Sequence, residues 1–280
     1  MKWSIITDSS CDLRSADISE EGIDFTTVPF TIQLGSKEIE DDETADTYLL
    51  LTQIENSDSI PHTSCPAPGV WAEAFLKADA TIALTISSRL SGSFSSAELA
   101  RELVTEEHPE KSIAVLDSGS TGPALVLCVS RIKEWILSGL SFDEITAKAR
   151  ADVAAIHTVF ALSSFDNLVR NGRMSAIVGF IARKLGMWGI GAAGRSGEIC
   201  ILGKTRGRKA ALSCIMKEMI DKEFHGGKVA ISHCQNESMA AQLKETILRK
   251  WADTKVTILP TRGLNSFYAE REGLIVAYSE

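Results

Sequence analysis

The apolar and polar residues of the first half of the chain alternate between strand-like runs and stretches with helical spacing. Three apolar runs that end in polar loops predict buried strands, over residues 3–7, 80–88 and 112–121. A helix that starts at prolines is predicted over 66–78, and further helices follow the second and third strands. Residues 25–43 alternate like short strands joined at a Gly-Ser turn. Strands that alternate with helices predict crossover units and a mostly parallel sheet.

The second half has a different pattern. Its predicted elements, in order, are a strand over 157–165, a short helix and basic turn over 166–175, an apolar helix over 175–188, a strand from 198 that enters a long helix ending near 224, a β-α-β unit over 228–260, and a final strand over 273–278. The apolar helix carries Ile177, Ile181, Leu185 and Trp188 on one stripe. The stretch Gly189–Gly194 is predicted to be a flexible turn.

The length of 280 residues exceeds the common size of a single domain. We therefore expect an α/β protein of two domains. Residues 1–156 form an N-terminal domain with a mostly parallel sheet and flanking helices. Residues 157–280 form a C-terminal domain with a mixed α/β sheet.

Composition and charge narrow the class of protein. The chain is 44% hydrophobic and 24% charged, which is ordinary for a globular protein, and its net charge of −8 argues against nucleic-acid binding. The longest uncharged runs, near 118–130 and 153–165, are too short and polar to span a bilayer. The N-terminus reaches Asp8 before a secretory apolar core could form, so we expect a cytoplasmic protein. The six cysteines lack C-x-x-C spacing and are interpreted as small buried hydrophobes rather than zinc ligands.

Hydroxyl-rich loops follow three N-terminal strands, at 7–10, 85–93 and 116–122, and a fourth such loop spans 61–68. Ligands of open parallel sheets bind beyond the carboxyl ends of the strands, where helix N-termini suit an anion. In the second loop Gly92 would let a ligand approach the backbone, and Ser91 and Ser93 could add hydroxyl donors. In the fourth, Thr63 and Ser64 precede the proline-started helix. Ser and Asp are also favoured helix caps, so the pattern fits either an anion site or ordinary capping.

Three other motifs bear on the chemistry of the chain. A serine nucleophile is disfavoured because the residues around Ser93 lack G-x-S-x-G spacing and no histidine stands out as a base. The G-x-G-x-x-G match at 189–194 lacks the preceding strand and following helix of a dinucleotide site. Asp8, Asp12 and Asp117 at strand ends could hold Mg²⁺, or could simply cap helices.

Two basic stretches, 170–173 and 204–208, stand out in an acidic chain. Arginine forks bind carboxylates and phosphates, so these stretches could face a partner's phosphoryl group; a solvated turn and a helix start are the alternative interpretation.

The motifs in their order along the chain resemble those of DegV-like fatty-acid-binding proteins. They are IITDSSCDL at 5–13, TS at 63–64, LTISSRLSGSFSSA at 84–97, VLDSGS at 115–120, LVRNGRMS at 168–175 and KTRGRKAA at 204–211. The resemblance covers nearly the whole chain. It implies two α/β domains with a long-chain fatty acid between them, its carboxylate held by hydroxyls and its tail in an apolar tunnel of the C-terminal domain. It also implies a separate fatty acid kinase that forms the acyl phosphate, so the chain itself would perform no catalysis.

The same resemblance assigns roles to individual residues. Thr63, Ser64 and Ser93 become carboxylate contacts, beside Gly92. Arg173 matches the arginine of a G-G-R-type turn, although Asn171 replaces a common glycine, and Arg206 matches a basic position on the kinase-facing surface.

One stretch departs from the family. Many relatives have G-T-H-x-G-P-G near the C-terminus, with a histidine that helps hold the carboxylate, whereas this chain has LPTRGLNSFYAEREG over 259–273. Arg262 or Ser266 is expected to take over the anion contact.

The leading hypothesis is therefore a cytoplasmic protein that binds a fatty acid and serves a fatty acid kinase, with no cofactor and no metal. The alternative is a metal-assisted enzyme that acts on a small phosphorylated or carboxylated metabolite through Asp8 and Asp117.

Overall fold

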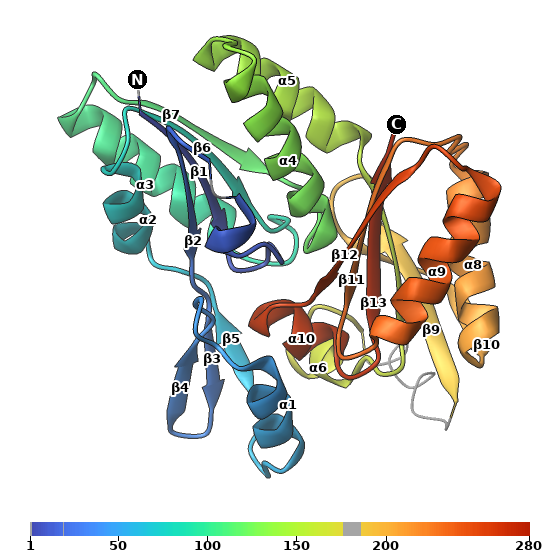
Figure 1. The fold of residues 1–280 in the computed structure, drawn as a ribbon. Coiled ribbons are helices and arrows are strands. Elements are labelled where there is room, and N and C mark those ends of the chain that lie inside the picture. The colour runs from blue at the N-terminus through green and yellow to red at the C-terminus, as the bar shows by residue number, and fades with distance from the viewer. Residues whose placement is uncertain (1, 19, 176–185) are drawn as a thin grey trace.

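The computed structural model describes residues 2–18, 20–175 and 186–280, which form three sheets with helices packed around them (Figure 1). The strands of the first sheet are β1 (Trp3–Asp8), β2 (Ile23–Val28), β6 (Ala80–Thr85) and β7 (Ser112–Asp117). They pair in the order β2-β1-β6-β7, and every pair is parallel. The strands are short apolar runs because helices cover both faces of the sheet.

Helices lie on the two faces of this sheet: α2 (Pro68–Phe75) and α3 (Ser93–Glu107) on one, α4 (Pro123–Leu137) and α5 (Phe142–Ala155) on the other. Neighbouring residues of β1 show the alternation, because Ile6 packs with Trp71 of α2 and Ile5 packs with Leu125 of α4.

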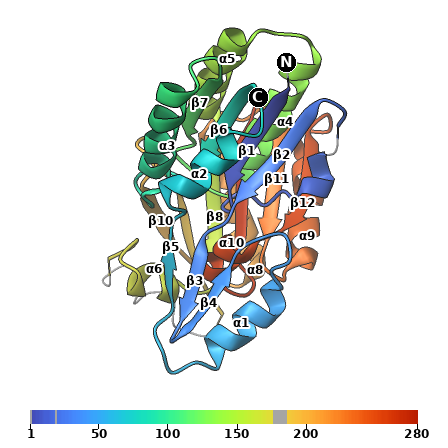
Figure 2. The same ribbon diagram turned by 90° about the vertical axis from the view of Figure 1, so that its left-hand side faces the viewer.

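A small antiparallel sheet projects from this layer. Its strands are β3 (Thr31–Leu34), β4 (Lys37–Glu40) and β5 (His62–Ser64), in the order β4-β3-β5, and α1 (Thr47–Glu55) packs beside them. A short 3-10 helix, η1 (Ser15–Ile18), follows β1. The three strands β3–β5 and α1 together form an arm, which Figure 2 shows below the parallel sheet.

The third sheet belongs to the second half of the chain and is mixed. Its strands are β8 (His157–Leu162), β9 (Met187–Ala193), β10 (Ile199–Arg206), β11 (Lys228–His233), β12 (Lys255–Pro260) and β13 (Leu274–Ser279), in the order β10-β9-β8-β13-β11-β12. The pair β11-β12 is parallel, and the other pairs are antiparallel. One face is covered by α8 (Arg208–Asp221) and α9 (Glu237–Lys250), while α6 (Asp166–Arg170) and α10 (Gly263–Ala269) lie at the end of the sheet near the arm (Figure 1).

Helix α4 lies between the parallel sheet and the mixed sheet. Its core cluster contains Ile82 of β6 together with Ala230 of β11 and Ala277 of β13. The small alanine side chains on this face of the mixed sheet let the helix approach closely, whereas Val229 and Ile231 point to α8 and α9. The two halves therefore share one apolar layer.

The predicted α/β class, with a parallel sheet in the first half of the chain and a mixed sheet in the second half, is confirmed. The first two sheets lie within residues 3–117 and the third within 157–279. The division into domains 1–156 and 157–280 stays a prediction.

Three local predictions were wrong. The predicted turn at 189–194 is strand β9 up to Ala193, and the end of the predicted helix, including Trp188, belongs to the same strand. Gly189 and Gly191 leave room for the rings of Phe165 and Phe160, because a Cβ at either glycine would collide with those rings. The glycines are thus explained by close packing on a strand rather than by a turn. Ile177, Ile181 and Leu185 lie outside the described residues.

The third error is at residues 62–64, which were predicted as a loop and form β5 by pairing with β3.

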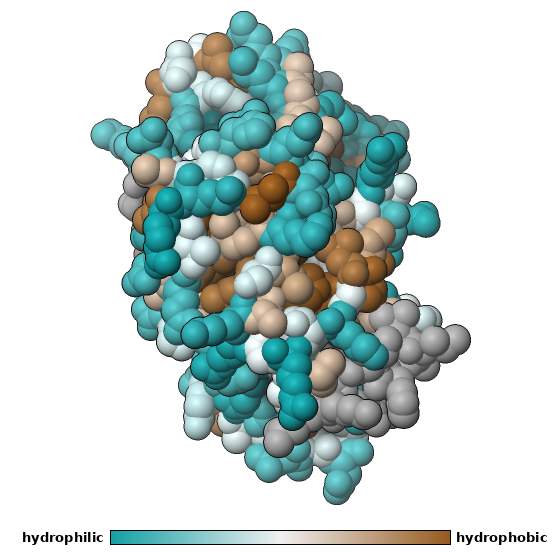
Figure 3. All heavy atoms as spheres, turned by 90° about the vertical axis from the view of Figure 1, so that its right-hand side faces the viewer, coloured by the Kyte–Doolittle hydropathy of each residue, from teal (hydrophilic) through white to brown (hydrophobic). Residues whose placement is uncertain are grey.

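Within the described ranges, no helix is long and apolar enough to cross a membrane. Figure 3 shows the side of the molecule near α8 and β10, where apolar side chains gather across the middle of a largely hydrophilic face.

Candidate functional site

A cavity with about 800 Å³ of space between its atoms, counting its opening to solvent, lies where the first half of the chain meets the mixed sheet and α10. Apolar side chains dominate its lining and come from both halves, among them Phe30, Ile86, Leu90, Phe160, Leu264 and Ile275.

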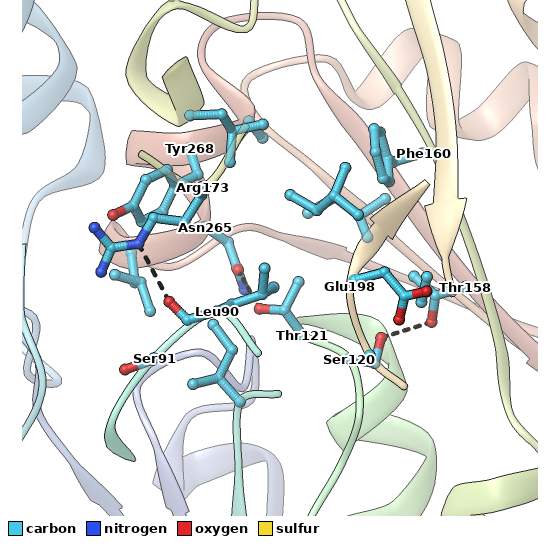
Figure 4. A pocket seen from close by; sticks show the side chains of 18 of the residues that line it. Leu90, Ser91, Ser120, Thr121, Thr158, Phe160, Arg173, Glu198, Asn265 and Tyr268 are labelled. Atoms are coloured by element: carbon cyan, nitrogen blue, oxygen red, sulfur yellow. Dashed lines mark hydrogen bonds between the residues drawn. The ribbon is translucent and has the colours of Figure 1, made fainter. Parts of the chain in front are cut away.

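One end of the cavity carries a cation and several hydroxyls (Figure 4). The Thr63 hydroxyl of β5 and the Tyr268 hydroxyl of α10 form a hydrogen bond of 2.7 Å across it. The guanidinium of Arg173 lies 6.0 Å from the centre of the Tyr268 ring and is held by the carbonyls of Leu90 and Asn171. Burial raises the pKa of Tyr268, so its hydroxyl keeps its proton and can donate to an anion.

The opposite end is also polar. The Ser120 and Thr158 hydroxyls share a hydrogen bond of 2.7 Å, and Glu198 lines the cavity on the same side (Figure 4). Between the two ends, Thr121 donates to the side-chain oxygen of Asn265 at 2.8 Å.

The Ser93 hydroxyl donates to the Asp8 carboxylate at 2.6 Å, in a fully buried position. Asp8 also accepts from the Ser10 hydroxyl at 2.5 Å and from the Ile86 backbone N–H at 2.9 Å. Burial raises the pKa of Asp8, and these donors oppose the rise. The network joins the ends of β1 and β6 to the first residue of α3.

The other predicted residues near Ser93 differ in whether they reach the cavity. Ser91 lines the cavity, and its hydroxyl accepts from the Ser93 backbone N–H at 3.3 Å. Gly92 is the N-cap of α3, and Cys65 packs 3.5 Å from where its Cβ would be. Ser64 is exposed at the end of β5. Thr63 is thus on the cavity wall, while Ser64, Gly92 and Ser93 are not among the described lining residues.

Arg262 is fully buried and binds the first half of the chain. Its guanidinium donates to the carbonyls of Leu13 and Asp41, to the Thr27 hydroxyl and to Glu43, at 3.0–3.2 Å. Ser266 is buried beside it, and its hydroxyl lies 2.7 Å from that of Thr261. Neither residue is among the described side chains that line the cavity.

The start of α10 explains this arrangement. Asp41 of the arm accepts from the backbone N–H groups of Gly263 and Leu264, at 2.8 and 2.7 Å. Asp12 accepts from the Arg262 backbone N–H at 2.8 Å and from the Asn265 side chain at 2.9 Å. Two carboxylates from the first half therefore cap this helix, and the guanidinium offsets their charge.

The carboxylates considered for a metal act as hydrogen-bond acceptors. Asp117 accepts from the backbone N–H groups of Ser88 and Gly119, at 3.1 and 2.9 Å. Among the described residues, no group of three His, Cys, Asp or Glu side chains is arranged to hold a metal ion. Arg206, at the end of β10, is exposed.

Sequence reasoning missed Tyr268, Thr158 and Glu198, whereas Ser120 belongs to the hydroxyl-rich loop 116–122. Tyr268 lies four residues after Leu264, so an apolar stripe over 263–269 could have predicted α10 and its cavity-facing side. Thr158 and Glu198 come from a strand and a separate turn that only the tertiary fold brings together.

Comparisons with known proteins match this architecture over its whole length. A family model described as "Uncharacterised protein, DegV family" matches residues 2–278. A DegV domain-containing protein of Streptococcus pyogenes serotype M1 is 37% identical over 278 residues, which is 99% of both chains.

Two solved structures are similar in fold and sequence. The Streptococcus pneumoniae Fatty Acid Kinase (Fak) B3 protein, loaded with linoleic acid, is 34% identical with a TM-score of 0.97, over 100% of this chain and 99% of that one. A DegV family protein from Eubacterium eligens, loaded with heptadecanoic acid, is 33% identical with a TM-score of 0.94, over 99% of both chains. By sequence and by fold, the chain belongs to the DegV family.

Proposed function

We propose that this protein binds a long-chain fatty acid in the cavity and presents its carboxylate to a separate fatty acid kinase, which forms the acyl phosphate. The observation that carries the proposal is a cavity lined mainly by apolar side chains from both halves of the chain, with Arg173 and the Thr63–Tyr268 hydroxyl pair at one end. The two solved relatives loaded with linoleic and heptadecanoic acid support it.

The apolar wall supplies the affinity. Each methylene group removed from water contributes roughly 0.8 kcal/mol, so a long acyl chain gains more from this lining than a short one. The acyl chain is held without charge along most of its length, and the carboxylate head group fixes which end of the cavity it points to.

The carboxylate lies at the Arg173 end. There it accepts from the Tyr268 and Thr63 hydroxyls, which exchange their mutual hydrogen bond for two bonds to the anion, and Ser91 adds a third hydroxyl from the loop before α3. Charge-assisted bonds of this kind are stronger than those between neutral groups. Ser64, Gly92 and Ser93 support the site by shaping that loop and the strand beside it, and Arg262 and Ser266 support it by fixing α10.

The kinase approaches from the same end. Arg173 stands at the head group and Arg206 is exposed on β10, so both can face the phosphoryl donor of the partner. The relative named as the B3 protein of fatty acid kinase supports a partner of this class. The chain acts as a binding protein, and the chemistry belongs to the kinase.

The experiment is organic extraction of the purified, denatured protein followed by mass spectrometry, with uptake of added fatty acid by the delipidated protein as the second arm. We expect about one fatty acid per chain. Absence of an extracted acid, together with failed uptake, would sink the proposal.

A substitution tests the head-group site. Arg173→Met should weaken binding of the free acid about tenfold or more, because a bond to a charged group contributes about 1.5–3 kcal/mol. The methyl ester should lose much less, because it lacks the negative charge. Arg249→Met, an exposed change at the end of α9, is the control. Equal losses for acid and ester would place the head group elsewhere.

A further inference from the structure

The two ends of the cavity differ in charge and in hydrogen-bonding character. Arg173, Thr63 and Tyr268 stand at one end, while Glu198 and the Ser120–Thr158 pair stand at the other (Figure 4). The first end suits an anion. The second end is more polar than a plain hydrocarbon tail requires.

Backbone contacts hold Glu198 at this far end. The turn between β9 and β10 closes through a bond of 2.7 Å from the Gly194 N–H to the Glu198 carbonyl. Ser87 then donates its hydroxyl to the Gly197 carbonyl at 2.7 Å, and its backbone N–H to the Ser120 carbonyl at 2.8 Å. A Cβ at Gly197 would collide with Ser87 and Gly119, so the turn fits only because residue 197 is glycine. Ser87 therefore links the Glu198 turn to the Ser120 loop.

The hydroxyl pair has one hydrogen to spare. Ser120 and Thr158 each carry one hydroxyl hydrogen, and their mutual bond uses only one of them. Both side chains line the cavity and are almost fully buried, with 7% and 6% of their surface exposed. A hydrocarbon tail cannot accept the remaining hydrogen, whereas a ligand oxygen can.

Donor and acceptor are thus both available at the far end. The spare hydroxyl hydrogen can be donated to a ligand oxygen. The Glu198 carboxylate is exposed and already accepts from the Ser196 backbone N–H at 3.0 Å, and its other lone pairs can accept a hydrogen from the ligand. A ligand hydroxyl has both properties, and a ligand carboxylate would meet the negative charge of Glu198.

We propose, resting on the proposed function, that the far end of this cavity selects long-chain fatty acids that carry a hydroxyl group on the acyl chain and rejects a second carboxylate. Glu198, Ser120 and Thr158 are the specificity-determining residues, and the head group stays at the Arg173 end.

The experiment measures binding of octadecanoic acid, a series of hydroxyoctadecanoic acids with the hydroxyl at successive positions, and octadecanedioic acid to the delipidated protein. At least one hydroxy isomer should bind about threefold to tenfold more tightly than the parent acid, which is the range of one net neutral hydrogen bond. The diacid should bind about tenfold more weakly.

Variants assign these differences to the residues. In Ser120→Ala/Thr158→Val the preferred hydroxy isomer should lose its advantage, while octadecanoic acid binds as before or better. In Glu198→Gln the diacid should gain about tenfold, and Glu245→Gln, an exposed change on α9, should change no ratio. Thermal melting of each variant verifies that it is folded.

The outcomes separate the two proposals. If octadecanoic acid binds stoichiometrically but every hydroxy isomer binds more weakly, the selectivity proposal is overturned and the carrier function stands. A preference that survives the double variant would also overturn it. If no acid binds at all, both proposals fail.

Discussion

At the scale of single residues, Arg262 shows how a charge can serve the fold. Its guanidinium donates hydrogen bonds to Leu13, Asp41, Thr27 and Glu43, all in the first half of the chain. Arg262 itself is the N-cap residue of α10, in the second half. Burying this cation costs desolvation, which the four acceptors offset.

Arg262→Met should therefore lower the free energy of unfolding by about 3–5 kcal/mol, because it leaves the carbonyls of Leu13 and Asp41 without their donor and removes the charge that offsets the buried Asp41 carboxylate. Urea titration of the delipidated protein measures this, and Arg249→Met should stay within about 0.5 kcal/mol of the wild type. Unchanged stability with lost fatty-acid affinity would instead return Arg262 to the anion site that the sequence suggested.

Asp12 sets a pH dependence at the same junction. Burial raises the pKa of Asp12 from 3.8 to about 6, although Asn265 and the Arg262 N–H donate to it. The folded protein therefore holds a proton between these pH values that the unfolded chain releases. This contribution to stability is fully present below pH 3.8 and is lost as the pH rises through about 6.

Asp12→Asn should remove this dependence. The Asn oxygen can still accept from Arg262 and Asn265, and its amide replaces Oδ2, which has no partner among the described residues. Stability measured by urea titration from pH 4 to 7 should fall by roughly 1–3 kcal/mol less in the variant than in the wild type. Parallel curves for the two proteins would mean that Asp12 is ionised throughout.

At the scale of elements, β9 depends on its glycines. Gly191 faces the ring of Phe160 and the backbone of Cys200, and a Cβ there would collide with both. Gly191→Ala should therefore cost about 1–3 kcal/mol through overpacking, measured by thermal or urea unfolding.

Two further variants test whether overpacking against the Phe160 ring causes the loss of stability. Gly69→Ala, in α2 with no atom within 4 Å of the new Cβ, should be neutral or slightly stabilising. In the Phe160→Leu background, Gly191→Ala should lower the stability by less than it does in the wild type, because the smaller side chain leaves room for the new methyl group. Strictly additive losses would show that the ring is not what the new methyl meets.

The same strand shows why sequence predicts some elements and not others. The strands β1, β6 and β7 are visible as apolar runs because both faces of their sheet are covered. Gly189 and Gly191 look like a turn until the partner rings are known. Helix α5 has a local signal that was overlooked, the capping box of Ser141 and Glu144, whereas α10 is capped by Asp41, some 220 residues away in sequence.

The residues of the candidate site also divide into those that the sequence could predict and those that it could not. Thr63 and Arg173 were found because each belongs to a motif of the family, and both line the cavity. The place of Ser93 could not be predicted, because its hydrogen bond to Asp8 depends on how β1 packs beside β6. The departure from the family motif at 259–273 signalled a change in this region, and the residue that reaches the cavity with a hydroxyl is Tyr268 rather than Arg262 or Ser266.

At the scale of the whole molecule, the two halves meet around the cavity. Helix α4 packs on both large sheets, and Thr63–Tyr268, Ser87–Gly197 and Thr121–Asn265 hydrogen bonds join the halves at points along the cavity. A ligand in this space touches both halves at once, so its binding energy opposes their separation.

A bound fatty acid should therefore stabilise the protein as one unit. At a free ligand concentration 100 times Kd, the gain is about 2.7 kcal/mol, which corresponds to a rise in Tm of roughly 5–10 °C for a chain of this size. Differential scanning calorimetry of the delipidated protein with and without fatty acid measures it. The expected result is a single transition that moves as a whole. Two transitions, of which the acid moves only one, would mean that the ligand is held by one half alone and that the shared cavity does not couple them.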